Sequence, residues 1–119
     1  RIENIKKRNI NSRHLKQVLH FIEENYGQSI SLNDMSEVAG VTPQHLCRLF
    51  RKAFNMRPVE YLTMLRLKKA KELLVNPDNL TLNEIGKLTG FNDTSYFCSV
   101  FKRYEGVTAL EFKRMHKEF

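Results

Sequence analysis

The stretch SLNDMSEVAGV at residues 31–41 recurs as TLNEIGKLTGF at residues 81–91, an offset of 50 positions. A second pair follows, because LCRLFRKAFNMRPVEY at 46–61 matches FCSVFKRYEGVTALEF at 97–112 with an offset of 51. One residue is therefore gained between the two blocks of the second copy, just after Gly90. Internal similarity at a fixed period predicts that one supersecondary unit occurs twice.

Each copy opens with the pattern of a capped helix. Ser31 is followed three residues later by Asp34, and Thr81 by Glu84, and such pairs satisfy the free N–H groups at a helix start. A glycine stands nine residues after each hydroxyl residue, which is too early to end a helix of ordinary length. We therefore expect a tight turn between two packed helices in each copy.

The turn of the first copy has the residue types of a helix-turn-helix. Gly40 suits a turn conformation that a side chain opposes, and small Ser36 lies four positions earlier, where the two helices cross closely. Thr42 and Pro43 fit the N-cap and first-turn proline of the second helix. Gly86 repeats the small residue in the second copy, and the gained residue predicts a second helix that is one residue longer at its start.

Further helices are expected before and between the copies. Leu15, Val18 and Ile22 recur at helical spacing and predict one buried face near the start of the chain. Residues 58–76 begin at Pro58 and contain good helix formers, which predicts one continuous connector of about 18 residues, roughly 27 Å long.

A last capping pair, Thr108 with Glu111, predicts a short final helix. The fold class is therefore expected to be all-α, with seven helices that form two helix-turn-helix subdomains joined by a linker helix. The expected parts are a linker or arm at 1–11, a first helix-turn-helix unit at 12–57, the linker helix at 58–76 and a second unit at 77–119.

Composition favours a polyanionic partner and argues against an enzyme. Among 119 residues, 20 are Lys or Arg and 13 are Asp or Glu, which gives a formal net charge of +7. The four histidines have no nucleophile or paired acid at useful spacing, and the two cysteines form no CxxC pattern. We therefore expect no catalysis, no cofactor and no metal site.

The expected location is the cytoplasm, because no apolar run approaches the roughly 20 residues that span a bilayer. No membrane contact is expected. The chain starts at Arg1 without methionine, which suggests a fragment of a longer protein.

Two stretches resemble the DNA-binding domain of AraC/XylS-type bacterial transcription regulators: GFNDTSYFCSVFKRYEGVTALEFKR at 90–114 and YLTMLRLKKAKELL at 61–74. The resemblance covers about residues 12–118. It implies a seven-helix DNA reader with two units, usually attached to a domain that senses a sugar or another metabolite. It also implies activators that contact RNA polymerase on DNA, and dimerisation through a part not present here, so that this fragment is expected to be a monomer.

The sequence departs from the family pattern at a few places. Asn55 stands where Gly106 stands in the second copy, and asparagine tolerates the left-handed conformation of a helix end. Ala109 replaces the usual proline after Thr108. Cys47 and Cys98 occupy equivalent positions where the family often has serine; we expect both to be reduced, with a redox switch as the alternative.

The first recognition helix is expected at about 42–54, with Leu46, Leu49 and Phe50 facing the core. The first turns of such a helix reach base edges, and flanking cations contact phosphates. Gln suits adenine and Arg suits guanine, so Gln44 and Arg48 are the best candidate base readers. A solvated surface remains the alternative for Arg48, and a plain helix-start residue for His45. The candidate base contacts are Thr42, Gln44, His45, Cys47 and Arg48, and the candidate phosphate contacts are Arg51 and Lys52.

The second recognition helix is expected at about 93–105 and carries smaller polar groups. Ser99 stands where Arg48 stands in the first copy, so the first unit is expected to carry most of the base discrimination. The candidate base contacts here are Asp93, Thr94, Ser95 and Ser99, and the candidate phosphate contacts are Lys102 and Arg103.

Eight basic side chains and one acid occur from Arg48 to Lys71, which predicts a positive surface on part of the linker helix. Arg66 either belongs to that surface or braces the two units through buried hydrogen bonds.

The rival hypothesis is an RNA-binding or protein-docking helical domain, such as a sigma-factor-like piece that works through polymerase. Phe and Tyr fall at core-spaced positions, which predicts no exposed aromatic platform for RNA bases. Double-stranded DNA is therefore the expected partner, with RNA polymerase as the expected second partner.

Overall fold

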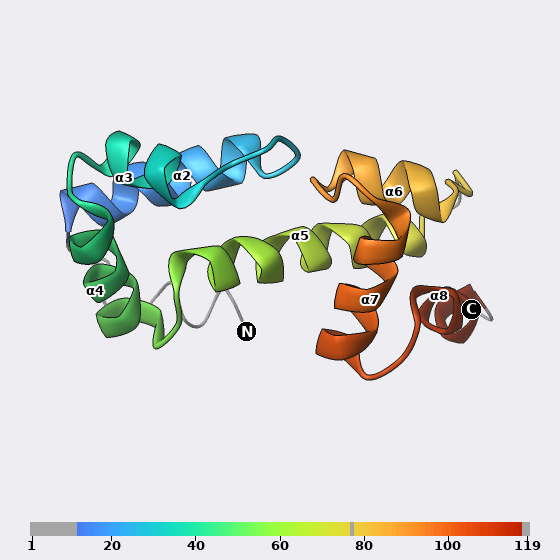
Figure 1. Ribbon diagram of the computed structural model, residues 1–119. Helices are drawn as coiled ribbons and strands as arrows, with labels where there is room; N and C mark the ends of the chain where they lie inside the picture. The colour runs from blue at the N-terminus through green and yellow to red at the C-terminus, as the bar shows by residue number, and fades with distance from the viewer. Residues whose placement is uncertain (1–11, 77, 118–119) are drawn as a thin grey trace. The chain divides into compact units, whose positions relative to one another are not determined.

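The computed structural model describes residues 12–76 and 78–117, so the predicted arm at 1–11 lies outside the described residues. Across the described residues seven helices follow one another without a strand, which confirms the all-α prediction (Figure 1). The chain divides into two compact units between Leu65 and Arg66, each with its own hydrophobic core. In the described part of the chain, no helix is long and apolar enough to cross a membrane.

The first unit contains α2 (Arg13–Asn25), α3 (Leu32–Ala39), α4 (Pro43–Phe54) and the first part of α5 (Pro58–Leu74). In this unit α2 packs against α3, and α4 packs against both (Figure 1). This arrangement is the helix-turn-helix that the sequence predicts, with α4 as its second helix.

Apolar side chains at helical spacing pack α2 and α4 into the core of the first unit. Leu15, Val18 and Ile22 bury one face of α2. Phe50 of α4 meets Tyr61 of α5 edge to face, with 5.6 Å between ring centroids. Since aromatic pairs at this separation are stabilising beyond their buried area, they hold α4 firmly against its neighbours.

The α3–α4 turn has the local structure that its residues favour. The Thr42 hydroxyl accepts a hydrogen bond from the backbone N–H of His45 at 3.1 Å, and Pro43 follows in the first turn. Gly40 adopts a left-handed conformation with φ of 73°, where a side chain would be strained. These features fix the direction in which α4 leaves the turn.

The second unit contains the last part of α5, α6 (Leu82–Leu88), α7 (Thr94–Glu105) and α8 (Ala109–Lys117). In this unit α7 packs against α6 and α8 (Figure 1). The two helices approach closely at Gly86, since a Cβ atom there would lie 3.4 Å from Cβ of Phe97. The crossing therefore leaves little room beyond a Cβ atom, which agrees with the small residue that the sequence predicts at this position.

The gained residue of the second copy lies in the turn and not in the helix, which corrects the sequence prediction. Both α4 and α7 have 12 residues. The N–H of Phe91 donates to the carbonyl of Gly86 at 2.8 Å, just as Val41 donates to Ser36 at 3.1 Å, so the two turns begin alike. Asn92 is then the extra residue, because Asp93 caps α7 through its side chain.

Both recognition helices end in the left-handed conformation. Asn55 has φ of 55° and Gly106 has φ of 83°, which confirms that asparagine replaces glycine at this position. After Gly106, the predicted capping box opens α8: Thr108 N–H donates to Glu111 Oε1 at 2.8 Å, and Glu111 N–H donates to the Thr108 hydroxyl at 3.0 Å. The hydrogen bond from the Thr108 backbone holds the pKa of Glu111 below its usual value.

Candidate nucleic-acid interface

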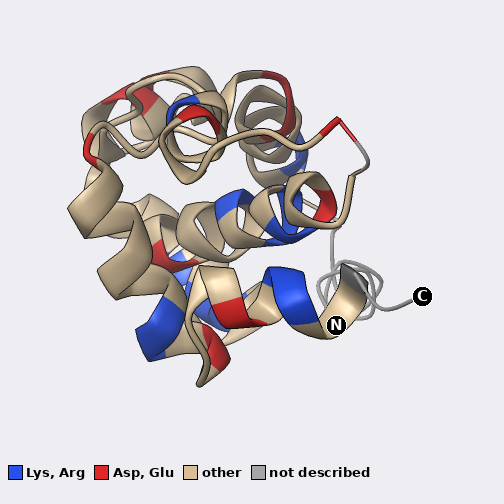
Figure 2. Ribbon diagram, turned by 90° about the vertical axis from the view of Figure 1, so that its right-hand side faces the viewer, with Lys and Arg blue, Asp and Glu red and all other residues tan. Residues whose placement is uncertain are grey.

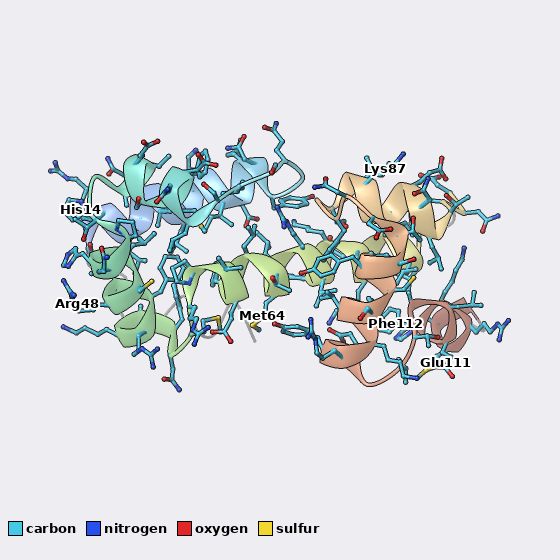
Figure 3. The ribbon with its side chains drawn as sticks, viewed as in Figure 1. His14, Arg48, Met64, Lys87, Glu111 and Phe112 are labelled. Atoms are coloured by element: carbon cyan, nitrogen blue, oxygen red, sulfur yellow. The ribbon has the colours of Figure 1, made fainter. Side chains whose placement is uncertain are left out.

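The outer face of α4 presents the polar residues that the sequence singled out. Gln44 and Arg48 are exposed, while His45 and Cys47 are half-buried. Arg48 extends from α4 away from the core of the first unit (Figure 3). Its guanidinium donates to Nδ1 of His45 at 3.3 Å, so the two side chains form one polar group in the first two turns of the helix. Thr42 is exposed, but its hydroxyl is engaged as the N-cap.

The equivalent face of α7 presents small polar groups. Ser95 and Ser99 are exposed, and Asp93 uses one carboxylate oxygen to accept the N–H of Ser95 at 3.1 Å. The Thr94 hydroxyl donates to Oδ1 of Asn83 on α6 at 2.7 Å. Asn83 is not among the residues predicted from the sequence, because its contact with Thr94 is tertiary and leaves no local pattern in the sequence.

Exposed cations lie in the last turns of both recognition helices. Arg51 and Lys52 occupy the last turn of α4, and Lys102 and Arg103 that of α7. All four are exposed. Lys and Arg are blue in Figure 2. Because these cations follow the polar residues along each helix, each helix combines candidate base readers with candidate phosphate contacts.

A groove of about 640 Å³ runs beside α7 in the second unit. Ser99, Lys102 and Arg103 line it from α7, and Thr108 and Leu110 line it from the start of α8. The candidate phosphate contacts of α7 therefore flank a concave surface, next to the N-terminus of another helix.

The second part of α5 offers fewer available cations than the sequence count indicates. Arg66 lies over the ring of Phe91, with 6.0 Å from Cζ to the ring centroid, and burial lowers its pKa. Lys71 forms an ion pair with Glu105 of α7 at 3.2 Å. Arg66 thus braces α5 against the turn of the second unit, and Lys71 braces it against α7.

Two tyrosines of α7 correct the expectation that aromatic residues fall in the core. The side chain of Tyr96 is 57% exposed and that of Tyr104 is 46% exposed. Tyr96 precedes buried Phe97 by one residue, which turns it by about 100° around the helix from that core position. Because the phenylalanines of α7 recur at core spacing, the sequence pattern did not predict that these two tyrosines are exposed.

Cys47 and Cys98 are both free thiols and half-buried. Cys98 packs against the core of the second unit and lines the groove beside Ser99. Among the residues that the structure describes, no cluster of His, Cys, Asp or Glu is suited to hold a metal ion.

A family model described as a helix-turn-helix domain matches residues 35–115. The chain belongs to the AraC-type helix-turn-helix family. This family consists of helix-turn-helix DNA-binding domains that occur in bacterial transcription regulators.

Relatives of this AraC-type domain include the Msm operon regulatory protein of Streptococcus mutans, which is 33% identical over 101 residues. That match covers 85% of the chain but 36% of the relative, so the chain spans about a third of the length of such relatives.

Two solved structures share the fold. The C-terminal domain of the two-component response regulator yesN from Fusobacterium nucleatum has a TM-score of 0.80 and 31% identity, covering 86% of this chain and 99% of that one. An AraC-type transcriptional regulator from Chromobacterium violaceum has a TM-score of 0.79 and 26% identity, covering 87% of this chain and 91% of that one.

We expect the cysteine of the second recognition helix to have no redox role in this AraC-type domain. Cys98→Ser should leave DNA affinity within about twofold of the wild type, because the change replaces one small half-buried group by another and the helix surface beyond it stays the same. The measurement is DNA binding in reducing and in oxidising buffer. A large loss of binding on oxidation that the substitution abolishes would instead establish a redox switch.

Proposed function

We propose that this chain reads double-stranded DNA with two recognition helices, α4 and α7, placed in successive major grooves. In each, the first turns carry the base-reading groups and the last turn carries the phosphate contacts. The base-reading residues are Thr42, Gln44, His45, Cys47, Arg48, Asp93, Thr94, Ser95 and Ser99, and the phosphate contacts are Arg51, Lys52, Lys102 and Arg103. The chain acts by binding alone and carries out no chemistry on its target.

The observation that carries this proposal is the order of groups along α4. Exposed Arg48 lies in the second turn, joined to His45, and exposed Arg51 and Lys52 follow in the last turn. A recognition helix that enters the major groove by its N-terminal end brings Arg48 to base edges and its last turn to the backbone. The planar guanidinium pairs with O6 and N7 of guanine, and the imidazole of His45 limits its freedom.

The test is Arg48→Ala on a duplex selected from random sequences by this chain. We expect a loss of about 1–3 kcal/mol on the preferred site and relaxed preference at one base pair, since one bidentate contact is removed. Binding is measured by fluorescence anisotropy on the preferred duplex and on the three variants of each base pair.

Arg51→Ala is the matched control, because it removes an arginine from the same helix less than one turn further on. It should weaken all duplexes alike and leave the preference unchanged. If Arg48→Ala also weakens every sequence equally, Arg48 contacts phosphate and our assignment of it as a base reader is wrong.

The two units are proposed to contribute unequally. Ser99 of α7 occupies the place of Arg48 in α4, and a hydroxyl discriminates bases less than a guanidinium does. The second unit therefore contributes phosphate anchoring through Lys102 and Arg103, together with weaker base contacts.

The remaining partners follow from family membership and are proposals for this chain. We infer a cytoplasmic activator that contacts RNA polymerase while bound to DNA. The isolated chain acts as a monomer, and the longer protein carries an effector-sensing domain through which it dimerises. Pull-down of polymerase in the presence and absence of the selected duplex tests the first of these inferences.

A further inference from the structure

Tyr96 is a large exposed side chain that the polar base-reading set does not include. It occupies the third position of α7, whose first residue is Thr94, and its side chain is 57% exposed. Its neighbours on the outer face are small hydroxyl groups, Ser95 and Ser99. The ring is therefore the largest group presented by the first turns of this helix.

The ring of Tyr96 is supported by the buried ring of Phe91. Its centroid lies 6.1 Å from that of Phe91 at an interplanar angle of 55°. Phe91 is itself 3% exposed and packs on Phe97 at 5.2 Å. Arg66 lies over the same Phe91 ring. Because one edge is supported, holding the remaining ring in one position costs little conformational entropy, which favours its use as a contact surface.

The position of Tyr96 along α7 places it at the base-reading end. Tyr96, Ser99 and Arg103 stand at i, i+3 and i+7, so they form one stripe along the helix. Arg103 is the proposed phosphate contact at the far end of this stripe, and Ser99 is a proposed base contact in its middle. Tyr96 therefore lies nearest the end that enters the groove.

The chemistry of the ring selects one feature of the major groove. Thymine presents its C5-methyl group there, which is the apolar group that distinguishes it from the other bases, and aromatic carbon contacts it favourably. We propose that Tyr96 is a specificity-determining residue that contacts the C5-methyl group of a thymine in the second subsite. This proposal rests on the proposed function, and it adds an apolar contact to a helix otherwise equipped with small polar groups.

The first unit has no exposed tyrosine at the equivalent position. The position equivalent to Tyr96 at the repeat offset of 51 is His45, whose ring nitrogen is engaged with Arg48. The apolar contact is therefore specific to the second subsite, and it makes the two subsites different in kind.

The experiment replaces each thymine of the selected duplex singly by uracil, which keeps base pairing and removes only the methyl group. One replacement in the second subsite should weaken wild-type binding about fourfold, the scale of one methyl group returned to water. Tyr96→Ala should bind the thymine and uracil duplexes equally. Tyr96→Phe should keep the discrimination, because the ring and not the hydroxyl makes the contact.

Tyr104→Ala is the matched control, since Tyr104 is also exposed on α7 but lies in its last three residues, beside Arg103. It should retain the difference between thymine and uracil. The proposal is overturned if no uracil replacement in the second subsite weakens wild-type binding, or if Tyr96→Ala still prefers thymine. The proposed function fails separately, if the wild-type chain selects no duplex at all.

Discussion

Inserting five base pairs between the two subsites of the preferred duplex is expected to reduce affinity to that of the first unit alone. The proposed site is asymmetric, spans around 17–20 base pairs and has subsites about 10 base pairs apart between centres. Half a helical turn moves one subsite to the other side of the duplex. The expected loss is on the order of 100-fold or more, since two linked modules gain about that much over one.

The physical reason lies in α5. It is one continuous helix of 17 residues, about 26 Å long at the usual rise. Leu62 and Leu65 belong to the core of the first unit, whereas Leu67 and Leu74 belong to that of the second. Because residues of this connector belong to both cores, we propose that it prevents the second recognition helix from following its subsite to the far side of the duplex.

The control duplex carries the same five base pairs outside the two subsites and should bind as tightly as the original. On the inserted duplex, Arg48→Ala should still weaken binding, whereas Tyr96→Ala should have no effect. Unchanged affinity for the inserted duplex would mean that a single helix-turn-helix engages DNA or that α5 bends. Either outcome would contradict the proposal that two rigidly connected recognition helices read successive major grooves.

The sequence carried enough information for the two helix-turn-helix units because their determinants are local. Capping boxes, a turn glycine and apolar spacing each constrain a few neighbouring residues, and all were repeated. It did not locate the extra residue of the second copy, because an insertion after Gly90 is compatible with a longer turn or a longer helix. The choice depends on which residue caps α7, and Asp93 takes that place by bonding Ser95.

The candidate site was less predictable because exposure and pairing depend on tertiary contacts. Arg66 was open to two interpretations from sequence, and neither included the contact with the ring of Phe91 that the structure shows within the second unit. The sequence predicted Lys71 as part of a positive surface, whereas in the structure it pairs with Glu105, which lies 34 residues further along the chain. Tyr96 resembled a core residue because Phe97 follows it directly. Charge counts along a chain therefore overstate the positive surface, and aromatic spacing understates the exposed rings.

Binding to DNA is expected to weaken steeply with salt. Each phosphate neutralised releases condensed counterions and contributes about −0.9 to the slope of log K against log salt concentration. The four proposed phosphate contacts therefore predict a slope of about −3.6, or a loss of about 100-fold between roughly 50 and 200 mM salt. The measurement is a series of anisotropy titrations on the selected duplex. A nearly flat plot would count against DNA as the partner.

The salt dependence also distinguishes phosphate contacts from general charge. Replacing both Lys102 and Arg103 by alanine should make the slope shallower by about 1.8, since two counterion-releasing contacts are lost. Lys87→Ala removes an exposed cation from α6, outside the recognition helix (Figure 3), and should leave the slope unchanged. Because Lys71 is paired with Glu105, Lys71→Ala should likewise have little effect on the slope. If the slope instead changes in proportion to the charge removed, so that each single variant shows half the change of the double variant, net charge attracts the chain to DNA and α7 makes no defined phosphate contact.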